Sequence, residues 1–347
     1  MKDLTDVRKI SEQELKKSIA ELNEPTFRAN QILEWVWKKS VRSFGEMTNL
    51  PKSLIEKLNK QFKFYPIILD KEQLSNDGTI KSRFKLYDGH LIEAVLIPVP
   101  AESRFTVCVS CQVGCSLTCS FCATGRMERI RNLDPAEIYD QVVMVNAQCM
   151  AHFGKPITNV VYMGMGEPLL AYQNVLDSIK LLTSEQGLHM SAKRITVSTA
   201  GIAKMIKKLA DDDVKFNLAL SLHAADDKKR NEIMPINESN NLKTLTEALQ
   251  YFQIKSGNRI TFEYIAFQNF NLGEEDAKNL IKIYKKVPAR INIIEYNPID
   301  NAPFTNADFD QVDHFAKILR EAGVMVTVRK SRGKDIDAAC GQLANKA

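Results

Sequence analysis

No stretch of this chain is apolar over the roughly twenty consecutive residues that a helix needs to span a bilayer, so we expect no membrane partner. Its first residues, MKDLTDVRKI, also lack the apolar core of a secretory signal. Without such a signal, an odd number of cysteines, seven, favours a cytoplasmic protein whose thiols stay reduced. The cysteines are therefore expected to be metal ligands, catalysts or core residues rather than structural disulfides.

A strong excess of one charge is missing as well. The formal net charge of +5 over 347 residues permits a nucleic-acid partner but does not require one, because many basic enzymes bind none. The chain has no low-complexity tract and no internal repeat beyond an alternation of strands and helices. Its length suffices for two domains, or for one large α/β domain with an appendage.

Residues 1–75 are predicted to form a helical domain, with no strand in the first 65 or so residues, because their apolar residues recur with the helical period. The apolar stripes are Ala29, Ile32, Leu33, Val36 and Trp37, then Leu54, Ile55, Leu58 and Phe62. Basic residues are frequent here: Lys38, Lys39, Arg42, Lys52, Lys57, Lys60 and Lys63. Such a surface suits RNA phosphates, but the solvated face of an ordinary helical domain has the same composition.

The apolar period changes to two in residues 76–100. Ile80 and Phe84 alternate with basic residues, and Asp88-Gly89 precedes a second apolar run that starts at Leu91. This pattern is typical of a β-hairpin, because Asp-Gly supplies the turn between two alternating runs. We therefore expect residues 76–100 to be a hairpin that links two domains.

Strand and helix patterns alternate along the chain from residue 101 to about residue 335. The strand segments are RFTVCVS, ITNVVYMG, RITVS, FNLALSL, RITFEYI, INIIEY and VMVTVRK. Helices are expected from Pro135, after an Asp134–Glu137 capping box, and near 174–182, 202–210, 242–252, 274–286 and 308–321. Six or so successive βα units predict an α/β fold with a parallel sheet, either open and doubly wound or closed into a whole or partial barrel.

Unusual residues follow six of the seven predicted strands. They are the cysteine loop, Gly164 to Pro168, Ser198 to Gly201, Ser221 to His223, Asn297-Pro298 and the tail SRGKDIDAACG. In a parallel sheet or barrel these segments lie at the carboxyl ends of the strands, where such folds bind their ligands. The sequence therefore predicts one shared site at this edge.

Three cysteines in the first of these loops, Cys115, Cys119 and Cys122, have the spacing CxxxCxxC. Their thiolates can bind zinc or iron, and a structural zinc ion would take Cys108 or Cys111 as its fourth ligand. Three thiolates on a four-iron cube instead leave one iron open to another ligand. The residue spacing alone leaves both alternatives open.

The CxxxCxxC loop, the GEP loop one βα unit later and the six βα units together resemble the radical S-adenosylmethionine (radical SAM) superfamily. The strings CVSCQVGCSLTCSFCATG, MGMGEPL, SLHA, MPIN and DIDAACGQL resemble the RlmN/Cfr family of RNA adenine methyltransferases over nearly the whole chain. This resemblance implies a partial (β/α)6 radical SAM barrel over residues 101–335. It also implies an RNA-binding helical domain before the barrel and a functional tail at 336–347.

The same resemblance implies the cofactors. Cys115, Cys119 and Cys122 correspond to the ligands of a 4Fe–4S cluster, whose open iron is chelated by SAM. Gly166 and Glu167 correspond to the residues that meet the amino end of SAM. The rest of the SAM pocket corresponds to Ser198, Ser221, Leu222, His223 and Asn297. Two SAM molecules are expected per turnover, with an electron donor such as flavodoxin or ferredoxin.

Cys340, Cys108 and Glu93 match the remaining catalytic positions of the family. By resemblance, Cys340 carries a methyl group to the adenine, Cys108 releases the product by forming a disulfide with Cys340, and Glu93 accepts a proton. Without the family resemblance, the sequence indicates that Cys108 is a core residue of a buried strand and that Glu93 is a solvated acid. Cys149 reads as a core residue, and Cys111 has no assigned role.

Pro168 in the GEP loop favours methylation of adenine C2, because the C8-methylating members of the family tend to have alanine there. The expected substrates are an adenosine in the peptidyl transferase centre of 23S rRNA and the adenosine 3′ of the anticodon in tRNA, modified by a monomeric enzyme. Three alternatives stay open. They are a Cfr-like C8 methyltransferase, a radical SAM enzyme for a small molecule or peptide, and a zinc-stabilised RNA-binding protein.

Overall fold

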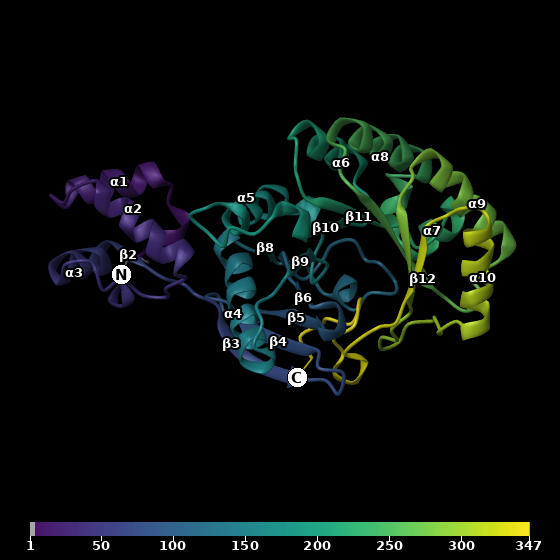
Figure 1. Ribbon diagram of the computed structural model, residues 1–347, viewed down its shortest axis with the longest axis horizontal. Coiled ribbons are helices and arrows are strands. Elements are labelled where there is room, and N and C mark those ends of the chain that lie inside the picture. The colour runs from purple at the N-terminus through teal and green to yellow at the C-terminus, as the bar shows by residue number, and fades with distance from the viewer. Residues whose placement is uncertain (1–3, 347) are drawn as a thin grey trace.

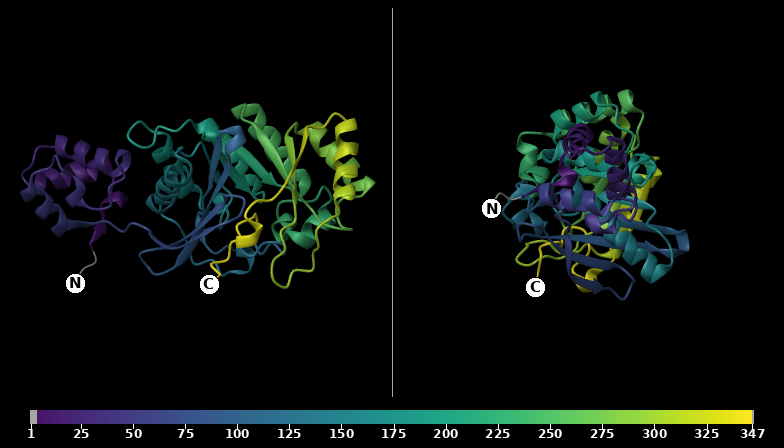
Figure 2. Two further views of the ribbon diagram at one scale, coloured as in Figure 1. Left: turned by 60° about the horizontal axis from the view of Figure 1, so that its bottom comes forward. Right: turned by 90° about the vertical axis from the view of Figure 1, so that its left-hand side faces the viewer.

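A small helical domain stands beside a larger α/β body in the computed structural model, which describes residues 4–346 (Figure 1). The chain leaves the helical domain through one extended segment and enters the sheet of the body. Figure 2 shows the same two lobes from other sides, with the helical domain set apart from the body. None of the described helices combines the length and the apolar character that a membrane crossing requires.

The helical domain contains α1 (Glu12–Glu21), α2 (Phe27–Leu33) and α3 (Lys52–Gln61), and a π-helical turn extends α2 over Glu34–Lys38. Its core consists of residues from all three helices, including Leu15, Ile19, Ala29, Ile32, Leu54 and Leu58. The expectation of no strand was wrong. Two short strands, β1 (Thr5–Asp6) and β2 (Phe62–Lys63), pair in parallel where the chain enters and leaves the domain. Strands of two residues are too short for a periodic pattern to reveal them.

The α/β body is built on a ten-stranded sheet in the order β14, β13, β12, β11, β10, β9, β6, β5, β4, β3. Its parallel strands are β6 (Arg104–Cys108), β9 (Asn159–Tyr162), β10 (Ile195–Thr199), β11 (Asn217–Ser221), β12 (Ile260–Ala266), β13 (Arg290–Glu295) and β14 (Val326–Arg329). Their neighbours pair in chain order, so each crossover returns beside the strand it left. The predicted α/β fold with a mostly parallel, barrel-like sheet is confirmed.

Three antiparallel strands continue this sheet at one end: β3 (Ile68–Leu74), β4 (Ile80–Lys85) and β5 (Leu91–Val99). The predicted hairpin corresponds to β4 and β5, with Gly89 in its turn at φ +85°. The prediction missed β3, which lies inside the segment 1–75 that was expected to be helical. Its sequence, ILDKEQL, has consecutive polar residues at an exposed sheet edge, so the alternation that marks a half-buried strand is absent. The hairpin thus belongs to the sheet of the α/β body, and β3 precedes it in the chain.

Helices cover the outer side of the curved sheet (Figure 1). They are α4 (Pro135–Phe153), α5 (Tyr172–Thr183), α6 (Ala203–Asp211), α7 (Asp227–Ile233), α8 (Leu242–Ser256), α9 (Glu274–Lys286) and α10 (Phe309–Glu321). All predicted helices are present, and the short α7 is an addition. Half of the expected capping box before α4 is directly visible, since the Asp134 N–H donates to Glu137 Oε2 at 2.8 Å.

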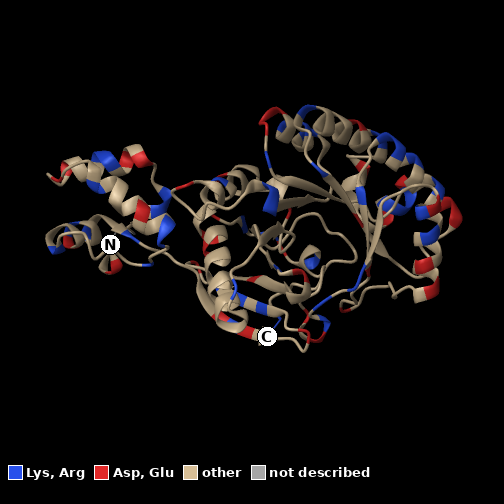
Figure 3. Ribbon diagram, in the orientation of Figure 1, with Lys and Arg blue, Asp and Glu red and all other residues tan. Residues whose placement is uncertain are grey.

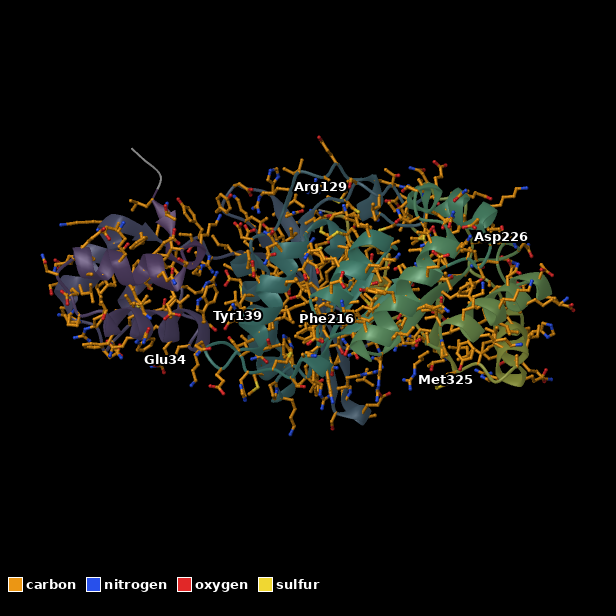
Figure 4. All side chains as sticks on the ribbon, turned by 90° about the horizontal axis from the view of Figure 1, so that it is seen from above. Glu34, Arg129, Tyr139, Phe216, Asp226 and Met325 are labelled. Atoms are coloured by element: carbon orange, nitrogen blue, oxygen red, sulfur yellow. The ribbon has the colours of Figure 1, made fainter. Side chains whose placement is uncertain are left out.

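A buried ion pair joins the helical domain to the α/β body. The Arg8 guanidinium donates to both carboxylate oxygens of Asp140 on α4, at 2.9 and 2.8 Å, and also binds Asp6. Beside it, the ring of Tyr139 meets Trp37 edge to face with centroids 5.4 Å apart. Figure 4 shows Tyr139 at this junction. A bidentate, buried pair combined with aromatic packing holds two domains together in one orientation better than an exposed pair does.

We predict that Asp140→Ala lowers the free energy of unfolding by on the order of 2 kcal/mol, because Arg8 then stays buried with only one carboxylate partner. Urea unfolding of the apoprotein measures this change. The matched control is Glu12→Ala, which removes the exposed pair with Lys16 on α1 and should cost less than about 1 kcal/mol. Equal losses in the two variants would contradict the structural role of the junction pair.

Candidate active site

The cysteine loop begins just after β6 and is closed at its base by two short strands. β7 (Gln112–Val113) pairs antiparallel with β8 (Arg131–Asn132), so the chain between them forms one excursion. Gly114 at its start has φ +73°, and a Cβ there would lie 1.9 Å from the Glu128 carbonyl oxygen. Only glycine fits this position, because both the backbone conformation and the close approach exclude a side chain.

Cys115, Cys119 and Cys122 lie in this loop as partly buried, free thiols. The loop packs on a small apolar cluster from the neighbouring strands and loops: Phe121, Ala200, Ala224, Ile233, Met234, Ile265, Phe267 and Tyr296. It is also tied to α7, because the Ser120 N–H donates to the Ile233 carbonyl at 3.1 Å. The three thiols are therefore held at the carboxyl ends of the strands, as the sequence predicted for this loop.

The three thiols in one loop form a donor set that fits an iron–sulfur cluster. A four-iron cube binds each thiolate through a different iron, so three cysteines would leave the fourth iron open to another ligand. Burial raises the pKa of Cys115 to about 11, and the Cys122 and Glu167 charges nearby add to the shift.

The GEP loop follows β9 and contacts Gln112 on one side and the end of β10 on the other. Gly166 has φ +102°, and a Cβ there would lie 2.5 Å from the Cβ of Gln112. Gln112 in turn accepts the Glu167 N–H at 2.9 Å. The buried Glu167 carboxylate accepts N–H bonds from Ala200 at 2.8 Å and Leu169 at 3.0 Å. Glu167 therefore ties the loop after β9 to the end of β10, although burial raises the pKa of its carboxyl.

Ser198 on β10 and Ser221 on β11 lie at the same rim, with their hydroxyl oxygens 3.5 Å apart. His223, two residues after Ser221, takes the left-handed conformation at φ +56°. Its Nδ1 accepts the Ile265 N–H at 3.2 Å, which assigns the proton of the neutral ring to Nε2. Burial lowers the pKa of His223 to about 3, and the positive charge of Arg230 adds to the shift.

Asn297, beyond β13, donates through Nδ2 to the Cys340 carbonyl at 3.2 Å. Its Oδ1 is buried and has no hydrogen-bond partner in the structure. Asn292 on β13 has a similarly unpartnered Oδ1, while its Nδ2 donates to Glu263 at 2.8 Å. Buried acceptors without donors are costly unless a ligand supplies the donor. The hydroxyl and amino groups of SAM are donors of the required kind.

The C-terminal segment returns to this rim and brings Cys340 with it. The Gly341 carbonyl accepts the Ala123 N–H at 2.7 Å, so the segment contacts the cysteine loop directly. Cys340 keeps an exposed surface, yet the protein around it raises the pKa of its thiol to about 11, with Glu263 adding to the shift. The Cys340 thiol is also among the groups that raise the pKa of Cys108, after burial.

Cys108 and Glu93 share one face of the sheet. Cys108 pairs with Val95 across β6 and β5, and Glu93 lies two residues before Val95. Both are buried, so the reading of Glu93 as a solvated acid was wrong. Its Oε2 accepts the N–H groups of Ala344 at 3.0 Å and Asn345 at 3.2 Å.

Sequence reasoning missed four buried polar residues of this region: Arg230, Asn237, Glu263 and Asn271. Arg230 stands in the polar string DKKRNE, which reads as a solvated helix face. Asn237 lies in the quoted string MPIN, but nothing in that string indicated a contact. The exposed or buried state of such residues depends on packing between distant segments, which local patterns do not encode. As expected, Cys149 is in the core; Cys111, for which no role was assigned, is also buried.

Comparisons with known proteins agree with this geometry. Residues 5–63 match the ribosomal RNA large subunit methyltransferase N-terminal domain, and residues 109–281 match the radical SAM superfamily. A probable dual-specificity RNA methyltransferase RlmN of Cytophaga hutchinsonii is 56% identical, over 98% of this chain and 93% of that protein. The dual-specificity RNA methyltransferase RlmN of a Nitratiruptor species is 39% identical, over 100% of this chain and 99% of that protein. A radical SAM methyltransferase of Sphaerobacter thermophilus has a crystal structure that matches with TM-score 0.92 and 38% identity, over 99% of this chain and 100% of that one.

We predict an acid sensitivity that depends on His223. Its pKa falls from 6.5 to about 3 on folding, so below 6.5 the unfolded chain binds a proton that the folded protein does not. Stability is therefore lost as the pH falls, by about 2 kcal/mol at about pH 5. Urea unfolding of the apoprotein at about pH 7.5 and pH 5 should show a smaller loss for His223→Gln than for the native chain.

The control is His314→Gln, which changes an exposed histidine on α10 and should keep the native pH dependence. A His223→Gln variant with the full native loss of stability at acid pH would contradict a buried, neutral His223.

Proposed function

Because the chain belongs to the RlmN family of radical SAM RNA methyltransferases, we propose that it methylates C2 of adenine in 23S rRNA and in tRNA. The observation that carries this proposal is full-length similarity to relatives named dual-specificity RNA methyltransferases. The proposed targets are an adenosine of the peptidyl transferase centre and the adenosine 3′ of the anticodon. Pro168 in the GEP loop supports C2 over C8, which is the position modified by Cfr-type members.

Cys115, Cys119 and Cys122 are the proposed cluster ligands, and the rim of strand ends beside them is the proposed SAM site. A 4Fe–4S cluster bound there supplies the electron for the reductive cleavage of SAM. The free Oδ1 of Asn297 is suited to accept a hydrogen bond from SAM. Two SAM molecules per turnover serve as methyl donor and radical source, and a flavodoxin or ferredoxin delivers the electrons.

Cys340 is the proposed methyl carrier. Its exposed position at the rim allows it to receive a methyl group as S-methylcysteine. After loss of a hydrogen atom, that carbon adds to C2 of adenine and joins protein and RNA through a thioether. Glu93 would accept the C2 proton as the adduct radical returns one electron to the cluster. The Cys108 thiolate would then attack the Cys340 sulfur to form the disulfide, and the electron pair of the broken carbon–sulfur bond would take up a proton to complete the methyl group. The shared face of Cys108 and Glu93, and the hydrogen bond from the Ala344 N–H of the C-terminal segment to Glu93, support these roles.

The helical domain is the proposed RNA grip of an enzyme that acts as a cytoplasmic monomer. Lys and Arg are distributed over this domain and over the outer helices of the body (Figure 3). Lys38 and Lys39 end the π-helical turn, and the Lys39 ammonium lies 3.6 Å from the Trp35 ring centroid. Arg42 donates to the Ile67 carbonyl, so its charge also serves the connection between domains. Lys38 and Lys39 are therefore better candidates for phosphate contacts.

The function is tested by mass spectrometry of RNA treated with reconstituted protein, SAM and reductant. We expect one added methyl group at C2 of a single adenosine in 23S rRNA fragments and in tRNA. Cys115→Ala should abolish both methylation and SAM cleavage, because the variant lacks a cluster ligand. A methyl group at C8 would replace the proposal by the Cfr-type alternative. Unmodified RNA from a cluster-loaded, SAM-cleaving protein would contradict RNA as the substrate.

We predict that Cys108→Ala traps a covalent protein–RNA complex, because all steps before release still proceed. The complex should survive denaturation. On a denaturing gel, most of the reacted protein should run as a band that migrates more slowly than free protein. The matched control is the double variant Cys108→Ala/Cys340→Ala, which has no methyl carrier and should give no such band. Free protein and normally methylated RNA from Cys108→Ala would return Cys108 to a purely structural role.

A further inference from the structure

Arg230 on α7 is fully buried, and the acceptors of its guanidinium are all neutral oxygens. Nε donates to the Leu222 carbonyl at 3.1 Å, and Nη1 donates to Asn237 Oδ1 at 2.6 Å. Nη2 donates to the Ala200 carbonyl at 2.6 Å and to the Ser221 carbonyl at 3.1 Å. Burying a charge whose hydrogen-bond acceptors are all neutral is expensive, so a residue that only filled space here would be apolar.

These acceptors belong to two strand ends of the candidate SAM site. Ala200 follows β10, while Ser221 and Leu222 end β11. Glu167 binds the Ala200 N–H, so both backbone polar groups of Ala200 are held, one by the GEP loop and one by Arg230. One planar guanidinium thus sets the separation of β10 and β11 where their residues face the ligand. A lysine could not reproduce this, because its ammonium lacks the fixed fork of donors.

Asn237 orients the guanidinium. Its side chain is fully buried, and its Nδ2 donates to Asp227 Oδ1 at 2.9 Å and to Asn231 Oδ1 at 2.6 Å. These bonds fix the amide so that Oδ1 faces Arg230. The asparagine of the string MPIN therefore has a structural role, because it holds the buried arginine in place.

The helix that carries Arg230, α7, contacts the cysteine loop at its last residue. The last residue of α7, Ile233, accepts hydrogen bonds from the Ser120 N–H and hydroxyl at 3.1 and 3.3 Å. Cys119 packs against the apolar cluster that contains Ile233 and Met234. Burial lowers the pKa of Arg230 to about 10, against the effects of Cys119 and Asp227, so the guanidinium remains protonated at neutral pH.

We propose that Arg230, oriented by Asn237, is a positioning residue that holds the ends of β10 and β11 in the SAM-binding arrangement and raises the reduction potential of the cluster held by Cys115, Cys119 and Cys122. This inference rests on the proposed function, because it concerns the same cluster and the same SAM site. A fixed positive charge stabilises the reduced form of an iron–sulfur cluster, which carries one more negative charge.

The test compares Arg230→Met and Arg230→Lys in the reconstituted enzyme without RNA. Redox titration followed by electron paramagnetic resonance gives the midpoint potential, and equilibrium dialysis gives the Kd of SAM. Arg230→Met should have a more negative potential and bind SAM at least about tenfold more weakly, since it loses both charge and donors. Arg230→Lys should keep the native potential while its SAM affinity falls. The matched control, Arg320→Met on the exposed face of α10, should change neither value.

Native potential in folded Arg230→Met overturns the electrostatic role, and native SAM affinity in that variant overturns the positioning role. If Arg230→Met does not fold, Asn237→Ala decides, since it keeps the charge but frees the guanidinium; unchanged SAM affinity there overturns the inference. None of these measurements involves RNA, so they fail independently of the substrate assignment. A native protein that binds no iron–sulfur cluster would instead contradict the proposed function.

Discussion

Parallel pairing from β6 to β14 is the constraint on which the rest of the structure depends. Each crossover returns to the same end of the sheet, so every loop that follows a strand emerges at one rim. The cysteine loop, the GEP loop and the turns at Ser221 and Asn297 are distant in the chain but adjacent in space for this reason. A single antiparallel insertion among these strands would send one of these segments to the opposite end.

Residue patterns predicted most of the fold because buried strands and amphipathic helices have strong periods. The parallel strands and the six predicted helices are all present, and the family resemblance indicated the proposed cluster ligands. What the patterns could not reveal are features decided by contacts between distant segments. Examples are β3 at an exposed edge, the burial of Glu93 under the C-terminal segment, and Arg230, whose surroundings come from β10, β11 and the MPIN turn.

Two buried arginines show how the same side chain serves two purposes. Arg8 at the domain junction faces carboxylates on both sides, so its charge is neutralised where it is used for attachment. Arg230 donates only to neutral acceptors in the interior of the body. The difference follows from position, because Arg8 joins two domains, whereas Arg230 joins the ends of two neighbouring strands.

The strands do not close into a ring, since β14 and β3 are the two free edges of the sheet. The segment after β14 bridges these edges: Asp335 accepts from the Ser75 hydroxyl at 2.6 Å, and Arg83 donates to the Lys346 carbonyl at 2.7 Å. The gap between the two edges is thus closed by irregular chain rather than by a further strand. A ladder between strands breaks cooperatively, but a seam of separate side-chain bonds can open in single steps. The C-terminal segment beside Cys340 can therefore detach locally while every paired strand keeps its register.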